Sequence, residues 1–167
     1  KSKPDGYTLA GVGVPIAFNT ALGKKLPYDP VTDLSPIAEV VTQPLLVVSH
    51  PSVPVGSFKE LIDWARKQPS PLAYTSGGSG SYGHLWFEMV AAQQRIAAQH
   101  VGYSGVAPAL RDVIGGQVPV LVDAIVPTGV QVKAGKVKGL AIVRNKRSPM
   151  LPDVPTLQEM LYIIIIR

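Results

Sequence analysis

Short runs of β-branched and other apolar residues alternate with amphipathic segments between residues 45 and 143. The first apolar run, LLVVSH at residues 45–50, is followed by SFKELIDWARKQ at residues 57–68. In this second segment Ser57 and Glu60 stand at capping-box spacing, and apolar residues recur at helical spacing. The apolar face of the predicted helix comprises Phe58, Leu61, Ile62 and Ala65. The pattern therefore predicts a buried strand followed by an amphipathic helix.

The same alternation continues along the chain. A strand is predicted over LAYT at residues 72–75, and a helix over HLWFEMVAAQ at residues 84–93. The segments IAAQHV, APALRDVIGG, VPVLVD, VPTGVQVKAG and KGLAIV then repeat the pattern up to residue 143. Strands that alternate with helices are typical of βαβ units. We therefore predict an α/β fold with a mainly parallel sheet of about four or five strands.

Residues 1–44 follow a different pattern. One strand is predicted over residues 7–12 and a short helix over residues 16–22, and prolines then punctuate residues 24–40. Because so few elements cannot bury a core of their own, we predict that residues 1–44 are part of a first lobe that this chain contains only in part.

The remaining boundaries follow from this division. Residues 45–143 are predicted to form a second α/β lobe, and residues 144–167 to cross back toward the first lobe. Two crossings between lobes would make a hinge. The chain begins without methionine just before a predicted strand, so we expect that residues precede it. The run from Ile163 to Ile166 belongs to no recognisable element and is given no function.

Composition and charge narrow the class of protein. Hydrophobic residues make up 46% of the chain and charged residues 16%, which is typical of a globular protein and argues against disorder. The formal net charge is +5, but the basic residues are scattered and do not lie beside aromatic residues on one helix. No nucleic-acid partner is therefore expected. The chain has no cysteine and no apolar run of the ~20 residues needed to span a bilayer.

The segment YTSGGSGSYGH at residues 74–84 lies between a predicted strand and a predicted helix, and it is the main candidate site. Gly78, Gly80 and Gly83 satisfy the G-x-G-x-x-G pattern of dinucleotide-binding loops. That pattern requires an acidic residue about 20 positions later, where this chain has Gln99, His100 and Val101. A nucleotide site is therefore a weak alternative.

A hydrolase is the second alternative. Ser79, His84 and Asp123 could form a catalytic set, but the glycine that completes a G-x-S-x-G elbow is absent. Their order along the chain also differs from that of the α/β-hydrolases. His84 could equally be a residue at the start of a helix that packs or caps locally.

An anion-binding loop explains more of the residues. A glycine-rich turn after a strand exposes successive backbone N–H groups, and the following helix adds its unpaired N-terminal donors. The hydroxyl groups of Ser76, Ser79 and Ser81 would supply further donors without charge. Such a site can bind a carboxylate and later release it.

Long phrases of the chain resemble one protein family. They are PDGYTL, KKLPYDPVTDLSPIAEV, PSVPVGSFKELIDWAR, LAYTSGGSGSYGHL, HVGYSGVAPALRDVIGGQV, VKAGKVKGLAIV and RSPMLPDVPTLQE. In this order they resemble the periplasmic solute-binding proteins of tripartite tricarboxylate transporters, known as the Bug family. The resemblance covers residues 4–159.

The resemblance implies a Venus-flytrap protein with two α/β lobes and mainly parallel sheets. It implies capture of a small organic carboxylate, either a di- or tricarboxylate, an aromatic acid or an amino acid, and its delivery to the permease subunits of the transporter. By this resemblance the protein is periplasmic and monomeric, is not an enzyme, and needs no cofactor or metal. A sensing module that binds a peptide or protein stays an alternative.

The resemblance also implies which residues bind the ligand. The predicted ligand-binding residues are Ser76, Gly77, Gly78, Ser79, Gly80, Ser81, His84, Tyr103 and Asp123. Asp123 could instead cap the following helix. Gly102 and Ser104 stand where the family usually has proline and lysine, which removes a cation beside Tyr103. The turn at residues 12–15 has fewer hydroxyl groups than is usual, so that wall of the site should be less polar.

Overall fold

The structure is a computed structural model that describes residues 3, 5–13, 16, 23 and 25–160. The chain divides into two compact units, residues 1–40 and residues 41–167. The predicted boundary after residue 44 stays a prediction. Each unit is described by itself.

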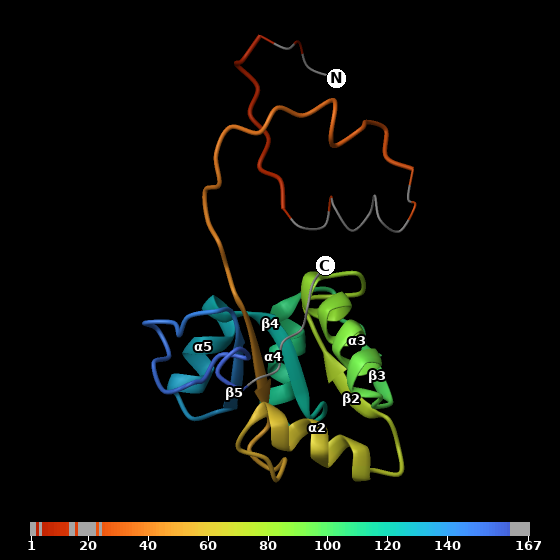
Figure 1. The fold of residues 1–167 in the computed structure, drawn as a ribbon, viewed down its shortest axis with the longest axis vertical. Coiled ribbons are helices and arrows are strands. Elements are labelled where there is room, and N and C mark those ends of the chain that lie inside the picture. Colours follow the sequence, from red (N-terminus) through yellow and green to blue (C-terminus); the bar gives the residue numbers. More distant parts are fainter. Residues whose placement is uncertain (1–2, 4, 14–15, 17–22, 24, 161–167) are drawn as a thin grey trace. The chain divides into compact units, whose positions relative to one another are not determined.

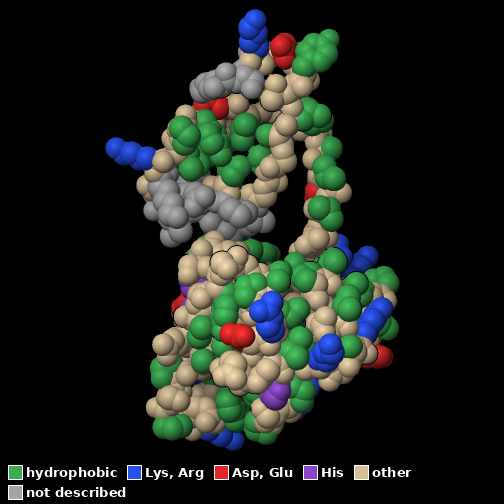
Figure 2. Space-filling model, turned by 180° about the vertical axis from the view of Figure 1, so that it is seen from behind, with side chains coloured by type: hydrophobic (Ala, Val, Ile, Leu, Met, Phe, Trp, Pro, Cys, Tyr) green, Lys and Arg blue, Asp and Glu red, His purple; other side chains and the backbone are tan. Residues whose placement is uncertain are grey.

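The described residues of the first unit are irregular. The strand predicted over residues 7–12 is wrong, because residues 7–13 form no strand and the side chains of Tyr7 and Leu9 are 92% and 75% exposed. A strand needs a hydrogen-bonded neighbour, and the described part of this unit supplies none. Hydrophobic side chains of this unit are open to view in Figure 2. The helix predicted over residues 16–22 lies, apart from Ile16, outside the described residues.

The second unit confirms the predicted α/β alternation (Figure 1). Its strands are β1 (Leu45–Ser49), β2 (Leu72–Thr75), β3 (Ala98–Val101), β4 (Val120–Ala124) and β5 (Lys138–Val143). Its helices are α2 (Phe58–Lys67), α3 (Tyr82–Gln94), α4 (Val106–Ile114) and α5 (Ile125–Lys133). On the face in Figure 2, Lys and Arg side chains are spread over the surface.

The strands form one five-stranded sheet in the order β3-β2-β4-β1-β5. β2 runs parallel to β3 and β4, whereas β1 runs antiparallel to β4 and β5. Four strands therefore point the same way and β1 points the other way. The sheet is mainly parallel, as predicted, but β1 does not form a parallel βαβ unit with β2.

The core lies on both faces of the sheet. Alternate residues of a strand point to opposite faces, so Leu45 and Val47 of β1 pack with α2 and α3, while Leu46 and Val48 pack with α4 and α5. The continuous apolar run of β1 is the sequence expected for a strand that is covered on both sides.

The segment after β5 packs on the same unit. Ile142 donates its N–H to the carbonyl oxygen of Pro155 and accepts the N–H of Leu157 at its own carbonyl oxygen. Leu157 and Val154 are buried in the core. The predicted crossover of residues 144–167 toward the first lobe stays a prediction, and residues 161–167, including the isoleucine run, lie outside the described residues.

The capping-box prediction for α2 is confirmed in its first half. Ser57 Oγ accepts the N–H of Glu60 at 3.2 Å, which satisfies one of the unpaired donors of the first turn. The Glu60 carboxylate accepts the N–H of Gly56 at 2.7 Å, one residue before the position expected for a capping box.

Helix α3 lies directly against the backbone of β4. A Cβ atom placed on Gly83, in the first turn of α3, would collide with the carbonyl oxygen of Val122. Only glycine permits this approach, because the atom it would meet belongs to the backbone and cannot rotate away. Gly83 therefore fixes the position of the start of α3, and with it the end of the preceding loop.

Gly83→Ala is expected to lower the free energy of unfolding by about 3 kcal/mol or more, since the added methyl group must displace backbone atoms. Urea unfolding followed by circular dichroism measures this change. Gly56→Ala is the matched control, because a Cβ there would meet only the Glu60 carboxylate at 3.6 Å. A change in the control within about 0.5 kcal/mol is expected, and an equally small change in Gly83→Ala would contradict the packing described.

Candidate ligand-binding site

The loops that follow β2 and β3 are in close contact. A Cβ on Gly78 would lie 3.1 Å from the carbonyl oxygen of Tyr103, and a Cβ on Gly102 would lie 3.1 Å from Ser79 Oγ. Gly78 has φ +135°, a conformation that a residue with a side chain rarely adopts. The carboxyl ends of parallel strands meet at one edge of a sheet, where α/β proteins commonly bind ligands.

Asp123, near the end of β4, lies at the same edge of the sheet. A Cβ on Gly77 would lie 2.8 Å from the Asp123 carboxylate, which accepts the N–H of Gly77 and, at 2.7 Å, the N–H of Ala124. Burial raises the pKa of Asp123, and these two N–H groups oppose that effect. The N-cap of α5 is Ala124, which has no side-chain capping bond. Asp123 therefore attaches the loop to β4 and does not cap α5 in this structure.

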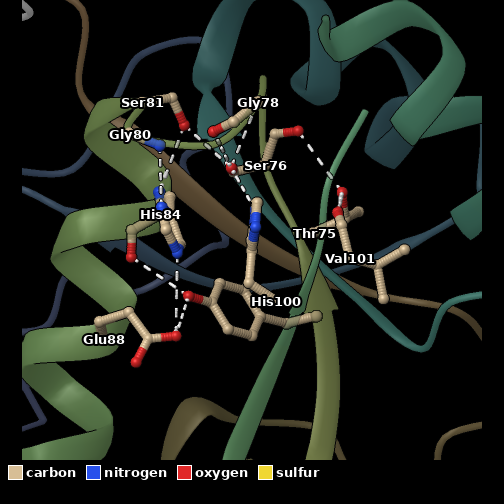
Figure 3. A network of polar contacts seen from close by, with 10 residues as sticks. Thr75, Ser76, Gly78, Gly80, Ser81, His84, Glu88, His100 and Val101 are labelled. Atoms are coloured by element: carbon tan, nitrogen blue, oxygen red, sulfur yellow. Dashed lines mark hydrogen bonds and ion pairs between the residues drawn. The ribbon is translucent and has the colours of Figure 1, made fainter. Parts of the chain in front are cut away.

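The hydroxyl group of Ser76 lies at the centre of the loop (Figure 3). Ser76 is fully buried, and its Oγ donates to the carbonyl oxygen of Gly78 at 3.1 Å and accepts from Ser81 Oγ at 2.9 Å. It also lies 2.8 Å from His100 Nε2. These contacts shape the loop from inside and occupy the Ser76 hydroxyl in this structure, and its predicted ligand contact stays a prediction.

Ser81 and His84 begin α3 and close the loop. Ser81 is the N-cap and accepts the N–H of His84 at 3.4 Å. The His84 ring turns back toward the loop, and its Nδ1 accepts the N–H of Gly80 at 2.9 Å. Gly80 has φ +78°, so this turn also requires glycine. The local-cap interpretation of His84 therefore describes its contacts in this structure.

Ser79 differs from the other two serines of the loop. It is exposed, and among the described residues no hydrogen-bond partner is found for its hydroxyl group. The sequence supplies no lysine or arginine in the loops at residues 76–81 and 102–105. The N–H groups of Gly77, Gly78, Gly80 and Ser81 are already engaged, by Asp123, Ser76, His84 and the Gly78 carbonyl oxygen respectively. A ligand held by these two loops would therefore meet neutral donors, namely the hydroxyl group and the N–H of Ser79.

Tyr103 contributes its backbone to the site. Its phenol donates to the Asp112 carboxylate on α4 at 2.6 Å, and this hydrogen bond raises the pKa of Tyr103. The predicted ligand contact of its hydroxyl group stays a prediction, because in this structure the hydroxyl is engaged by Asp112.

His100 is a residue of the site that the sequence analysis missed. It lies on β3 opposite Tyr74 of β2 and stacks on His84 with ring centroids 3.9 Å apart. Burial lowers the pKa of His100, and the neighbouring His84 lowers it further. The available signal was strand pairing, since a residue near the end of β3 must lie beside the loop that follows β2.

The geometry does not assemble the hydrolase alternative. His84 Nδ1 is engaged by Gly80, while its Nε2 lies 4.0 Å from Glu88. No hydrogen bond joins Ser79 to His84 within the described part of the chain, although a nucleophile and its base must be within hydrogen-bond reach. Ser76 does contact His100, but its burial leaves no access for a substrate.

Two features of the described residues bear on other functions. No group of three or more His, Cys, Asp or Glu side chains in that part of the chain could hold a metal ion. None of its helices is both long enough and apolar enough to cross a bilayer.

Asp123→Asn tests the electrostatics of the loop. Because burial raises the pKa of Asp123 above that of an unfolded chain, about 3.9, its carboxyl group favours folding below that pH and this contribution is lost as pH rises through the folded-state pKa. The stability of the wild type relative to Asp123→Asn is therefore expected to fall between pH 3 and pH 7. Urea unfolding at several pH values measures the difference.

Asp63→Asn is the control of opposite sign. A hydrogen bond from Lys59 holds the pKa of Asp63 below its usual range, so the wild type should gain stability relative to Asp63→Asn as pH rises. If the stability of the wild type relative to each variant changed with pH in the same direction, the opposite environments described for Asp123 and Asp63 would be contradicted.

The chain matches known proteins over nearly all of its length. Residues 1–165 match the model of the tripartite tricarboxylate transporter family receptor. The chain is 31% identical to the protein BugT of Bordetella pertussis, over 97% of this chain and 50% of BugT. It is 34% identical to a UPF0065 protein from the gbd 5′ region of Cupriavidus necator, over 94% of this chain and 47% of that protein. The chain therefore spans about half the length of the curated relatives it matches.

Solved structures agree with these relatives. A structure described as a periplasmic transporter is 30% identical, with a TM-score of 0.85 over 97% of this chain and 55% of the other. An R. palustris protein solved with adipate is 34% identical, with a TM-score of 0.74 over 81% of this chain and 46% of that one. MatC of Rhodopseudomonas palustris, solved with bound malate, is 30% identical, with a TM-score of 0.75 over 85% of this chain and 48% of MatC. The chain belongs to the tripartite tricarboxylate transporter receptor family.

Proposed function

We propose that the protein is a periplasmic solute-binding protein that captures a small organic carboxylate and delivers it to the permease subunits of a tripartite tricarboxylate transporter. The observation that carries this proposal is the meeting of the loops after β2 and β3 with the end of β4 around the exposed hydroxyl group of Ser79. The proposal includes no chemical step, so the ligand leaves unchanged.

The chemistry of this edge suits an anion that must be released. The start of α3 presents the positive end of its dipole, and the hydroxyl group and the N–H of Ser79 can donate to a carboxylate. Because the site offers no lysine or arginine in the loops at residues 76–81 and 102–105, no strong ion pair would have to be broken on release.

Dicarboxylates are the first ligands to test. Two similar proteins were solved with adipate and with malate, both of which carry two carboxyl groups. One carboxylate at Ser79 and the start of α3 would leave the second for contacts elsewhere in the protein. Capture between two lobes and a monomeric state stay predictions.

The predicted hinge between lobes stays a prediction. β1 runs opposite to its neighbours, so Leu45 at its start pairs with Ala124 of β4 and with Val143 at the end of β5. The chain therefore enters and leaves the sheet at the edge that carries residues 76–81, here called the ligand loop. A ligand held there could favour one arrangement of the connecting segments over another.

Isothermal titration calorimetry of the full-length protein against a panel of carboxylates, including adipate and malate, tests the proposal. Binding of at least one of them is expected, and the ligand should be recovered unchanged after long incubation. Absence of heat across the panel would contradict the proposal, and turnover of an ester or amide would favour the hydrolase.

Ser79→Ala is expected to weaken carboxylate binding about tenfold to a hundredfold, the effect of losing one hydrogen bond to a charged group. Calorimetry on the variant measures the dissociation constant. Ser70→Ala is the matched control, because Ser70 is exposed and precedes β2 at the opposite end of that strand. Equal affinities of Ser79→Ala and the control would remove Ser79 from the ligand site.

A further inference from the structure

Hydrogen bonds and a ring stack connect His84 and the residues around it to the ligand loop (Figure 3). The His84 ring holds the loop through the N–H of Gly80, and its own backbone N–H is held by Ser81. His100 stacks on the His84 ring and touches Ser76. The loop is thus attached to two imidazole rings, one from α3 and one from β3.

The hydrogen bond to Gly80 defines the protonation state of His84. A nitrogen that accepts an N–H carries no proton, so the ring is neutral in this arrangement and its hydrogen is on Nε2. Protonation would place a hydrogen on Nδ1 that points at the N–H of Gly80. The loop could then no longer keep the position that the structure shows.

Other titratable groups belong to the elements packed around the two rings. Glu88, one turn further along α3, lies 4.0 Å from His84 Nε2. The Tyr74 ring of β2 contacts both imidazole rings, and its hydroxyl group donates to the Glu88 carboxylate at 2.7 Å. Asp123 of β4 accepts from Gly77 and Ala124. Burial and the adjacent His84 lower the pKa of His100.

We propose that His84 is a positioning residue for the ligand loop and that only its neutral ring holds the loop ready for carboxylate, so that acid releases both loop and ligand. This inference rests on the proposed function and adds a role for His84, which would act through Gly80 without touching the ligand. Histidine suits such a switch because it titrates between pH 5 and 8.

The test measures the dissociation constant for adipate and malate by calorimetry between pH 8 and pH 5. In the wild type, affinity is expected to fall as pH falls, by up to about tenfold per pH unit once the ring is charged. His84→Asn should abolish most of this dependence, because the Asn side chain can place an oxygen where Nδ1 lies and does not titrate. Ionisation of the ligand itself cancels when the two proteins are compared.

His50→Asn is the matched control. The Nδ1 of His50 also accepts a local backbone N–H, that of Ser52 at 3.2 Å, but His50 follows β1 and, within the described residues, has no hydrogen bond to the ligand loop. Its pH profile should match that of the wild type.

A pH dependence that persists unchanged in His84→Asn would overturn the inference. So would an affinity that rises as pH falls, since it would mean that the imidazoles attract the carboxylate as cations. A merely structural role of His84 predicts weaker binding with the same pH profile.

A measurement without ligand separates this inference from the proposed function. In ¹⁵N-labelled protein the amide resonance of Gly80 is expected to shift with pH in the wild type and in His50→Asn. In His84→Asn it should stay nearly constant. A constant Gly80 resonance in the wild type would overturn the inference, even if carboxylates bind. A shifting Gly80 resonance with no carboxylate bound at any pH would contradict the proposed function alone.

Discussion

The buried hydroxyl group of Ser76 holds together the part of the molecule on which the site depends. It is the point where the end of β2, the start of α3 and the end of β3 share hydrogen bonds, through Gly78, Ser81 and His100. Buried polar groups need such partners, and a satisfied network specifies one arrangement. With Ser76 and Ser81 directed inward, Ser79 is the loop serine that faces outward. The interior of the loop therefore determines which donor a ligand can reach.

A second constraint is the close packing of backbone on backbone. Gly83 lets α3 approach Val122, and Gly78 and Gly102 let the loops after β2 and β3 approach each other. The glycines that resemble a nucleotide fingerprint in the sequence thus have a packing role in this fold. Gly80 differs, because its positive φ and its N–H serve the contact with His84.

The elements of the second unit could be predicted from the sequence because each has a clear period. Helix α2 has its apolar face at helical spacing, and β1 is a continuous apolar run. The direction of β1 could not be predicted, since a strand covered on both faces has the same composition beside parallel and antiparallel neighbours. The strand expected over residues 7–12 failed because pairing depends on a distant partner that local pattern does not reveal.

The candidate site was predicted in part. The loop and its neighbours at Tyr103 and Asp123 do lie at one edge of the sheet, as chain order after parallel strands suggests. The orientation of each side chain could not be predicted from the sequence, because residues 76, 79 and 81 are all serine and differ only in their packing. His100 was missed for the same reason. Its role arises from a ring stack between the consecutive elements α3 and β3, which composition alone does not reveal.

The reversed direction of β1 has a consequence for how the chain folds. Residues 45–49 sit in the interior of the sheet, but both of their partners come much later, at residues 120–124 and 138–143. Contacts between distant residues form slowly, because a long loop must close before they are gained. During synthesis this apolar segment therefore lacks both neighbours until β4 has left the ribosome, and lacks β5 until residue 143 has followed, so its apolar surface is exposed to non-native contacts during that time.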